Sequence, residues 1–223
     1  MAAVDFRRLY ALQDRVLEGL RDLETSLYLT GGTCLNRFYL EKRHSEDLDL
    51  FTNETSLYRE DVRRALDHLR SDGVQVGITV DSRDFVRIVV DSVLQVDFVC
   101  DRVTRHGGVQ RSPQGYRIDN LLNLVANKIT AIIGRDEPKD VFDAYLVARV
   151  APFEWGEAIR IADAKIALDR EVLEQRLRSF PLAMLDTLSV TDGTFLSALK
   201  ADYPALVDDI VNERTSRFPP WAG

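Results

Sequence analysis

Hydrophobic residues recur at three- and four-residue steps near the start of the chain, which predicts an amphipathic helix over residues 4–23. The next segment, SLYLT, predicts a short strand that ends at Gly31 and Gly32. Residues 33–43 predict a helix directly after this glycine turn, and residues 57–71 predict another. The first part of the chain therefore combines helices with at least one strand.

Between the last two helices, the segment DLDLF alternates acidic and apolar residues with a period of two. This alternation predicts a strand with Asp47 and Asp49 on one face. Three further strand-like runs cover residues 74–82, 84–92 and 93–101. The turns between these runs are short enough for hairpins, so we expect an antiparallel meander.

The periodicity becomes helical in the second half of the chain. Residues 102–116 contain glycine, proline and several arginines, which predicts a loop or a domain boundary. The five helices predicted beyond it cover residues 118–133, 139–149, 155–168, 171–177 and 203–214. The pattern thus indicates an α+β fold, with a mixed sheet and flanking helices followed by a helical C-terminal half. We expect two domains, 1–112 and 113–223, with the active site in a cleft between them.

Composition narrows the class of protein. The chain has 223 residues and a formal net charge of -7, which argues against nonspecific coating of nucleic acid. It contains no apolar run long enough for a membrane helix and no apolar block near its start, so we expect a cytoplasmic protein without membrane association. Cys34 and Cys100 lie in apolar segments and are expected to be buried thiols. The three histidines lack the spacing of a zinc site, so any metal is expected to bind to carboxylates.

Three acidic residues are the candidates for such a metal site. Asp47 and Asp49 occupy alternate strand positions, which lie roughly 6 to 7 Å apart. Asp97 alternates with apolar neighbours in LQVDFVC and points away from the core on its own strand. If the strands are neighbours, the three carboxylates converge, and two Mg2+ ions would relieve their repulsion. The alternative is a solvated strand face with no metal.

The glycine turn is the candidate for binding phosphate. Gly31 and Gly32 allow close approach of the backbone to a ligand, and the helix that starts near Thr33 would present free N–H groups to a triphosphate. Glycine pairs also occur in many tight turns without any ligand. The order of strand, GGT, helix and then SEDLDLF is more specific than either motif alone.

In this order of motifs the chain resembles the AbiEii-type toxin nucleotidyltransferases, which include the mycobacterial MenT toxins, within the DNA polymerase beta nucleotidyltransferase superfamily. The resemblance spans residues 27–149. The motif residues that carry it are Gly31, Gly32, Thr33, Arg43, Ser45, Asp47, Asp49, Asp97, Lys128, Lys139, Asp140 and Asp143.

The resemblance implies a catalytic role for five residues and nucleotide binding for several others. A hydroxyl would attack the α-phosphorus of a nucleoside triphosphate and pyrophosphate would leave. The implied metal ligands, for two Mg2+ ions, are Asp47, Asp49 and Asp97. The implied catalytic residues are these three with Lys128 and Asp143, and the implied nucleotide-binding residues are Gly31, Gly32, Thr33, Arg43, Ser45, Lys128, Lys139 and Asp140.

Each of these residues also has a purely structural interpretation. Lys128 could lie on the exposed side of an amphipathic helix, and Asp140 could be a first-turn acid favoured by the helix dipole. Ser45 could be a loop hydroxyl, although in some related proteins a serine or threonine at this place is phosphorylated by the partner antitoxin. Phosphate on Ser45 would add negative charge beside the metal-binding acids and hinder nucleotide binding.

The resemblance further implies a toxin that acts on the 3'-end of tRNA, with a cognate antitoxin as its protein partner. An acidic chain needs a local arginine surface to bind RNA, and the candidates are Arg102, Arg105, Arg111 and Arg117. A protein hydroxyl or a small molecule is an alternative acceptor. A catalytically silent nucleotide-binding module is the alternative outside the enzyme class.

Overall fold

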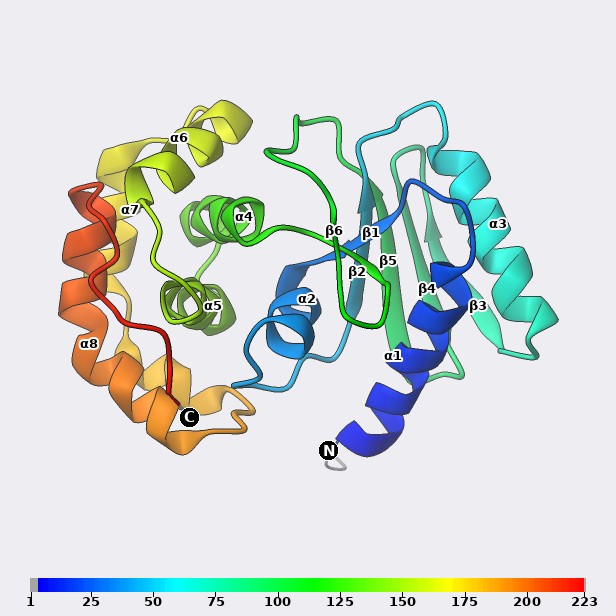
Figure 1. Ribbon diagram of the computed structural model, residues 1–223, viewed down its shortest axis with the longest axis horizontal. Helices are drawn as coiled ribbons and strands as arrows, with labels where there is room; N and C mark the ends of the chain where they lie inside the picture. The colour runs from blue at the N-terminus through cyan, green and yellow to red at the C-terminus, as the bar shows by residue number, and fades with distance from the viewer. Residues whose placement is uncertain (1–3, 223) are drawn as a thin grey trace. The chain divides into compact units, whose positions relative to one another are not determined.

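A computed structural model of the chain describes residues 4–222, so the outermost residues of the two predicted domains, 1–3 and 223, lie outside the described part. The strands belong mainly to the first half and the helices to the second (Figure 1). The elements are α1 (Phe6–Arg21), β1 (Tyr28–Thr30), α2 (Gly31–Phe38), β2 (Leu48–Thr52), α3 (Tyr58–Ser71), β3 (Val76–Asp81), β4 (Phe85–Val90), β5 (Leu94–Cys100), β6 (Gln110–Arg111), β7 (Arg117–Ile118), α4 (Leu121–Gly134), α5 (Pro138–Ala148), α6 (Trp155–Ile166), α7 (Arg170–Ser179), a 3-10 helix η1 (Leu182–Thr187) and α8 (Gly193–Val211).

The described strands form one mixed sheet in the order β3-β4-β5-β2-β1-β7-β6. The predicted meander is confirmed, because β3 pairs antiparallel with β4, and β4 pairs antiparallel with β5. Two pairs are parallel, β2 with β5 and β1 with β7. The parallel pairing of β2 with β5 makes neighbours of two strands that are about 45 residues apart in sequence, which the local pattern could not predict.

Helices α1 and α3 pack against each other, and they also contact β5 and β3 respectively. The apolar stripe of α1 is buried, as the helical periodicity predicts. In β4, buried Val86, Ile88 and Val90 alternate with half-buried residues. Burial of each such side chain contributes about 1.5–3 kcal/mol to folding. The side chains on one face of the sheet therefore pack in the core. The residues at the alternate positions point to the other face and are available for a functional site.

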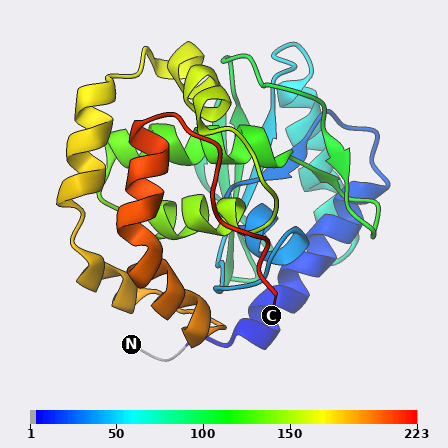
Figure 2. The same cartoon turned by 60° about the vertical axis from the view of Figure 1, so that its left-hand side comes forward.

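The helices that follow the sheet have a core of their own, in which α4 contacts α5, α6 and α7, and α8 contacts α5, α6 and α7. Large aromatic side chains fill it, and the rings of Phe142 and Tyr145 lie 5.3 and 5.1 Å from that of Phe195. The segment after α8 runs back along these helices (Figure 2). Trp221 on this segment packs 4.9 Å from Phe195 and donates its backbone N–H to the carbonyl of Arg149, so the tail is anchored.

Contacts divide the chain into two compact units. The sheet unit comprises the chain before Leu35 together with Ser45–Asp119, and the helical unit comprises Leu35–His44 together with the chain after Asp119. A compact unit need not fold independently, so the two predicted domains stay a prediction. Among residues 4–222, no helix is long and apolar enough to cross a membrane.

Several element bounds differ from the sequence prediction. Helix α2 begins at Gly31 and ends at Phe38. Beyond its end, the backbone N–H groups of Lys42 and Arg43 donate to the side-chain oxygen of Asn36, so they do not continue the helical hydrogen bonds. The predicted loop, residues 102–116, contains strand β6, which forms a ribbon with β7 directly after the loop. Each of these strands is only two residues long. Strands this short carry no readable period.

Helix α8 is also longer than predicted. It begins ten residues before the predicted start, at Gly193, where the carboxylate of Asp192 caps the N–H groups of Thr194 and Phe195. Pro204 lies inside this helix. Proline is best tolerated in the first helical turn, because it lacks the N–H that a position inside a helix needs. Helix α8 nevertheless continues through Pro204 and contacts α5, α6 and α7.

Candidate functional site

Four side chains lie in one row across the open face of the sheet. Asp49 on β2 is directly paired with Asp97 on the parallel strand β5. The row extends to Arg87 on β4, opposite Asp97, and to Thr30 on β1, opposite Asp49. Directly paired residues point to the same face of a sheet. Two of the three predicted metal-binding acids are therefore neighbours in register.

The third predicted acid, Asp47, lies one residue before β2 and has the same parity as Asp49. Its carbonyl oxygen accepts a hydrogen bond from the Thr33 hydroxyl, which ties this residue to the start of α2. Gly31 has a φ of +71°, and a Cβ added to it would fall 2.2 Å from Oδ2 of Asp49. Only glycine fits both the conformation and the close approach. The glycine motif thus lies directly against the acidic motif.

We refer to Asp47, Asp49 and Asp97 as the strand carboxylates. Asp97 is nearly buried, and both of its oxygens accept hydrogen bonds from Arg87, at 2.7 Å from Nε and 2.7 Å from Nη2. This forked geometry is the strongest form of a protein ion pair. The hydrogen bonds with Asp97, together with the negative charge of all the strand carboxylates, raise the pKa of Arg87. Arg87 is therefore the positive member of this site.

The donor chemistry of Asp49 and Asp97 fits a hard divalent cation such as Mg2+, which prefers carboxylate oxygens. Their register on adjacent strands places both carboxylates on one face of the sheet, and this arrangement fits a shared ion. Among the described residues, however, no three His, Cys, Asp or Glu side chains are grouped closely enough to hold one ion. The convergence of all three acids around metal stays a prediction.

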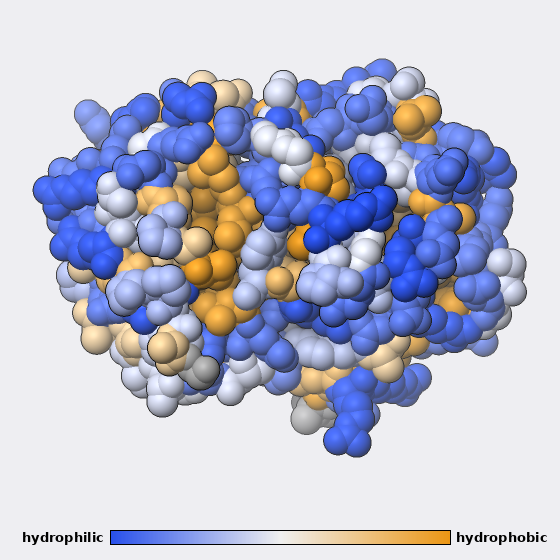
Figure 3. All heavy atoms as spheres, viewed as in Figure 1, coloured by the Kyte–Doolittle hydropathy of each residue, from blue (hydrophilic) through white to orange (hydrophobic). Residues whose placement is uncertain are grey.

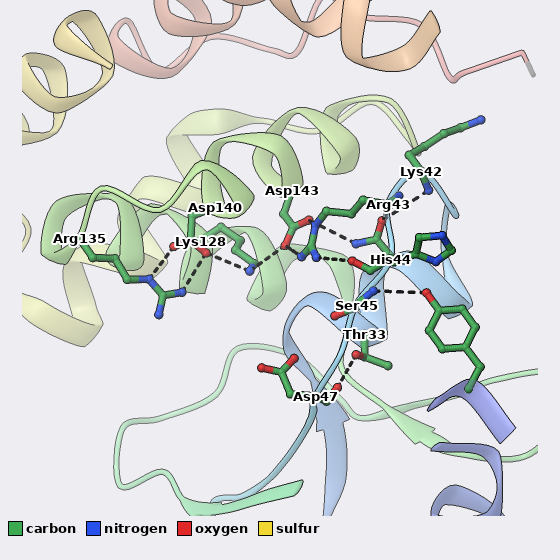
Figure 4. A network of polar contacts seen from close by, with 12 residues as sticks. Thr33, Lys42, Arg43, His44, Ser45, Asp47, Lys128, Arg135, Asp140 and Asp143 are labelled. Atoms are coloured by element: carbon green, nitrogen blue, oxygen red, sulfur yellow. Dashed lines mark hydrogen bonds and ion pairs between the residues drawn. The ribbon is translucent and has the colours of Figure 1, made fainter. Parts of the chain in front are cut away.

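In the helical unit, four of the predicted residues form a buried chain of ion pairs (Figure 4). Lys128 on α4 lies between two acids of α5, with its Nζ 3.0 Å from Asp140 and 2.8 Å from Asp143. Arg43 binds both oxygens of Asp143, and the half-exposed Arg135 binds both oxygens of Asp140 from outside. We refer to Arg43, Lys128, Asp140 and Asp143 as the buried network.

Because Asp140 and Asp143 are three residues apart on α5, they lie on the same face of that helix and can share Lys128. The side chain of Lys128 is only 8% exposed, so it is not on the wet side of its helix. Its charge is satisfied within the protein. Whether it also binds a nucleotide stays a prediction.

Charges within the buried network control its ionisation. Burial alone would raise the pKa of Asp143, but the positive charges of Arg43 and Lys128 outweigh it and lower that pKa to about 2. Burial would likewise raise the pKa of Asp140, and Lys128 and Arg135 reverse the direction. Burial lowers the pKa of Lys128, but Asp143 and Asp140 raise it overall. Lys128, Asp140 and Asp143 therefore stay charged at neutral pH.

Acid should consequently weaken the fold through Asp143. Its pKa in the folded state, about 2, lies below the ordinary value of 3.8. A lowered pKa stabilises the folded state above about pH 4, and this contribution is lost as the pH falls toward 2. We expect the free energy of unfolding to drop by about 2 kcal/mol from this residue across that interval. Urea unfolding at several pH values, with Asp143→Asn as the control, measures the drop, and identical pH dependence of the two proteins would contradict it.

Two further residues that were predicted to bind nucleotide, Ser45 and Lys139, belong neither to the strand carboxylates nor to the buried network. Ser45 is 3% exposed, and its backbone N–H and carbonyl are bonded by the side chains of Tyr10 and Gln13. Phosphorylation of Ser45 would require this segment to open. Lys139 is half-buried in the first turn of α5. Its predicted role in nucleotide binding is not tested by these contacts.

Three residues of these clusters were missed by the sequence prediction: Arg87, Arg135 and Asn36. Asn36 is fully buried, and its side-chain Nδ2 donates to Asp143 while its side-chain Oδ1 accepts from the backbone N–H of Arg43. The parity of Arg87 within FVRIVV shows that it points away from the core. Its partner could not be found from sequence, because that requires the register between β4 and β5.

A hollow of about 450 Å³ lies in the helical unit, and none of the predicted site residues lines it. Its walls are mainly apolar, with Leu121, Leu122 and Phe153 among them and Glu154 and Glu157 at its polar side. Figure 3 shows that hydrophobic residues gather on part of an otherwise hydrophilic surface. The chemistry of the predicted residues lies elsewhere, in the strand carboxylates and the buried network.

Comparison with known proteins shows which family the chain belongs to. The sequence model of the family described as "Nucleotidyl transferase AbiEii toxin, Type IV TA system" matches residues 15–222. The chain belongs to the AbiEii family. It is therefore a nucleotidyltransferase, as the motifs predicted. A search of curated proteins gave no match.

Among solved structures, the fold of this AbiEii-family chain is similar to that of JHP933 from Helicobacter pylori, with a TM-score of 0.59, 18% identity, and coverage of 95% of this chain and 96% of that one. This similarity confirms the predicted α+β nucleotidyltransferase fold. Matches were also found to MenT4, a nucleotidyltransferase toxin from Mycobacterium tuberculosis, with a TM-score of 0.47, 17% identity, and coverage of 92% and 93%. A polyadenylate synthase of Megavirus matches at a TM-score of 0.48 and 16% identity, over 65% of this chain and 32% of that one.

Membership of the AbiEii family settles the coarse function of the chain. A nucleotidyltransferase toxin uses a nucleoside triphosphate as its substrate, and a type IV toxin family implies an antitoxin as partner. The family also typically uses a divalent metal.

Proposed function

We propose that this AbiEii-family protein transfers a nucleotide from a nucleoside triphosphate to the 3'-terminal hydroxyl of tRNA in a Mg2+-dependent reaction. The observation that supports the chemistry is the register of Asp49 with Asp97, directly beside Gly31. Oxygen ligands on adjacent strands next to a glycine that admits no side chain are suited to a metal-bound triphosphate. The tRNA acceptor rests on the sequence resemblance.

In the proposed reaction, the acceptor oxygen forms a bond to the α-phosphorus and the bond from that phosphorus to the pyrophosphate oxygen breaks. Asp47, Asp49 and Asp97 would hold Mg2+, with two ions as the resemblance implies. Bound Mg2+ supplies positive charge for the triphosphate and the leaving pyrophosphate. Asp97 either serves as a ligand or accepts the proton of the attacking hydroxyl, and in both roles its oxygens must be accessible.

Gly31, Gly32 and Thr33 are proposed to contact the triphosphate at the start of α2, where the positive end of the helix dipole favours a phosphate. In the helical unit, Arg43, Lys128, Lys139, Asp140 and Asp143 keep their predicted roles in catalysis and nucleotide binding. The direct support for the buried network is structural, since its charges neutralise one another. We propose that it fixes the conformation of Arg43 and of the segment that leads to Ser45.

The direct test is to incubate the protein with Mg2+, each labelled nucleoside triphosphate in turn, and total RNA. Label in the tRNA fraction, located to the 3'-end and lost on addition of EDTA, is the expected result. Label in a protein or in a small molecule would replace the tRNA acceptor with one of the alternatives. Absence of label in every fraction would favour a silent nucleotide-binding module.

The contacts in the structure reduce the number of arginines that are candidates for contacting RNA. Arg102 forms a forked ion pair with Asp84, and Arg105 lies 3.7 Å from Asp119 and over the ring of Tyr28. The two remaining arginines, Arg111 and Arg117, face each other across the β6–β7 ribbon. Within residues 4–222, neither is within ion-pair distance of a carboxylate, although both line a hollow of about 520 Å³ that also has acidic residues in its walls.

Like charges placed directly opposite on a ribbon repel each other unless an anion lies between them. Burial is the main cause that lowers the pKa of Arg117, and repulsion from the charges of Arg111 and Arg105 acts in the same direction. A phosphodiester would relieve this repulsion. We therefore propose Arg111 and Arg117 as the phosphate contacts for the acceptor RNA.

Replacing both Arg111 and Arg117 by glutamine is expected to weaken tRNA binding by about tenfold at low salt. The slope of log affinity against log salt should fall by roughly 1.5 to 2, because each lost phosphate contact removes about one released counterion. Binding isotherms at several KCl concentrations measure both quantities. Arg102→Gln is the matched control, since Arg102 is already paired with Asp84. An unchanged salt slope in the double variant would exclude this ribbon from the RNA contact.

A further inference from the structure

Arg87 already provides one positive charge at the proposed cation site. Its guanidinium donates to Oδ1 of Asp97 from Nε and to Oδ2 from Nη2, both at 2.7 Å. Gln95 adds a longer contact to Oδ2, at 3.4 Å. Both oxygens of Asp97 are thus engaged by a cation.

The two partners of this ion pair differ in their freedom to move. The side chain of Asp97 is 10% exposed and belongs to β5, which is paired on both sides by β2 and β4. The side chain of Arg87 is 37% exposed. Its guanidinium carbon also lies 5.2 Å from the centre of the Phe85 ring, which offers it a second favourable surface. The arginine can therefore leave the pair while the carboxylate stays in place.

A divalent cation and a guanidinium compete for the same carboxylate. Mg2+ binds carboxylate oxygens directly at about 2.0–2.1 Å, which brings it within a few ångströms of any group already bonded to them. At that separation, a positive guanidinium repels the ion. The charges of Asp47 and Asp49 act on Arg87 as well, so its position beside Asp97 affects the whole set of strand carboxylates.

We propose that Arg87 is the resident counter-cation of the strand carboxylates, and that a divalent cation binds at Asp97 by displacing the Arg87 guanidinium. This inference rests on the proposed function, because it assumes a cation site at Asp49 and Asp97. It assigns Arg87 a positioning role. Arg87 holds Asp97 in place before the ion binds, and it sets the cation concentration that the site requires.

The first test is a titration of the full-length protein with Mn2+, followed by electron paramagnetic resonance and by calorimetry. Arg87→Gln should bind Mn2+ about tenfold more tightly than the unmodified protein, because the competing charge is gone. Arg102→Gln removes an equal charge from a forked pair on the same unit, with Asp84, and should change the affinity less than twofold. Circular dichroism checks that each variant is folded.

The outcomes separate this inference from the proposed function. Equal or weaker Mn2+ binding by Arg87→Gln, with clear binding by the unmodified protein, would overturn the role of Arg87 and leave the cation site standing. Equal tightening in Arg102→Gln would reduce the effect to net charge and also overturn it. Absence of Mn2+ binding in every protein would overturn the cation site and this inference together.

A second measurement uses the unmodified protein, so its result does not depend on a substitution at the site. In spectra of the unmodified protein labelled with nitrogen-15 and carbon-13, the Nε–H signals of Arg87 and Arg102 can be assigned through bonds from the backbone signals of the same residues. Mg2+ should shift the Arg87 signal and speed its exchange with water, because its bond to Asp97 breaks. The Arg102 signal should stay unchanged. An unperturbed Arg87 signal at saturating Mg2+ would show that no displacement occurs, even if Arg87→Gln failed to fold.

Discussion

Replacing Asp49 by asparagine is expected to reduce nucleotide transfer by at least about a hundredfold while the fold is retained. The substitution keeps the size of the side chain and removes one negative charge from a half-buried position beside Gly31. A carboxylate ligand to Mg2+ contributes several kcal/mol of stabilisation to the charge that develops in phosphoryl transfer, and each 1.4 kcal/mol is a factor of ten in rate. The measurement is the initial rate of label transfer at saturating Mg2+ and nucleotide.

The matched control for this experiment is Asp81→Asn. Asp81 lies on β3 of the same unit, is exposed, and pairs with Arg59. Its replacement changes the net charge by the same amount outside the row of site residues and should leave the rate within about twofold. If Asp49→Asn kept full activity in a folded protein, the assignment of the strand carboxylates to the reaction would be wrong. Equal losses in the two variants would instead indicate a nonspecific effect of charge.

The sequence predicted which face of the sheet Asp49 and Asp97 occupy, because a period of two determines the face of a strand residue. That rule placed Asp49 and Asp97 on the open face, with Leu48 and Phe98 in the core. It could not show that β2 and β5 are neighbours, since a parallel pair joins distant segments. For the same reason, the pairing of Arg87 with Asp97 was beyond the sequence prediction.

In the helical unit, the motif residues were recognised but their contacts were not. Lys128 was expected to meet a triphosphate or to face solvent. The structure places it between two acids of α5 and away from solvent, and its contact with a triphosphate stays a prediction. Helical spacing shows that Asp140 and Asp143 share a face, yet it cannot show which side chains from other elements approach that face. Arg43 illustrates this limit, because it is 100 residues away from Asp143 in sequence.

Local signals also competed in ways that only tertiary structure decides. Asn36 has ordinary helix-forming neighbours, but its side chain ends α2 early by bonding the backbone of Arg43. Conversely, Pro204 suggests a helical start, and the Asp192 cap moves that start ten residues earlier. Such competition explains why the helices were predicted better than their ends.

The largest expected effect on stability is that of Asp143→Ala, which should lower the free energy of unfolding by about 3–5 kcal/mol. Asp143 is fully buried and binds the Arg43 guanidinium through both oxygens, at 2.9 and 2.7 Å, and Lys128 at 2.8 Å. Its removal leaves two buried positive charges without this carboxylate. Since desolvation of these charges is not recovered elsewhere, the loss should exceed that of any exposed ion pair. Chemical unfolding at neutral pH measures it.

A double-mutant cycle distinguishes loss of the ion pair from loss of packing. If the cost arises from an unpaired guanidinium, Arg43→Met should recover part of the stability of Asp143→Ala, because it removes that charge and keeps apolar volume. We expect the two substitutions together to cost at least about 1 kcal/mol less than the sum of their separate effects. Strict additivity would show that Asp143 acts through Lys128 or through packing instead. In that case the buried network would not be what fixes Arg43, and its proposed role in positioning the segment before Ser45 would be lost.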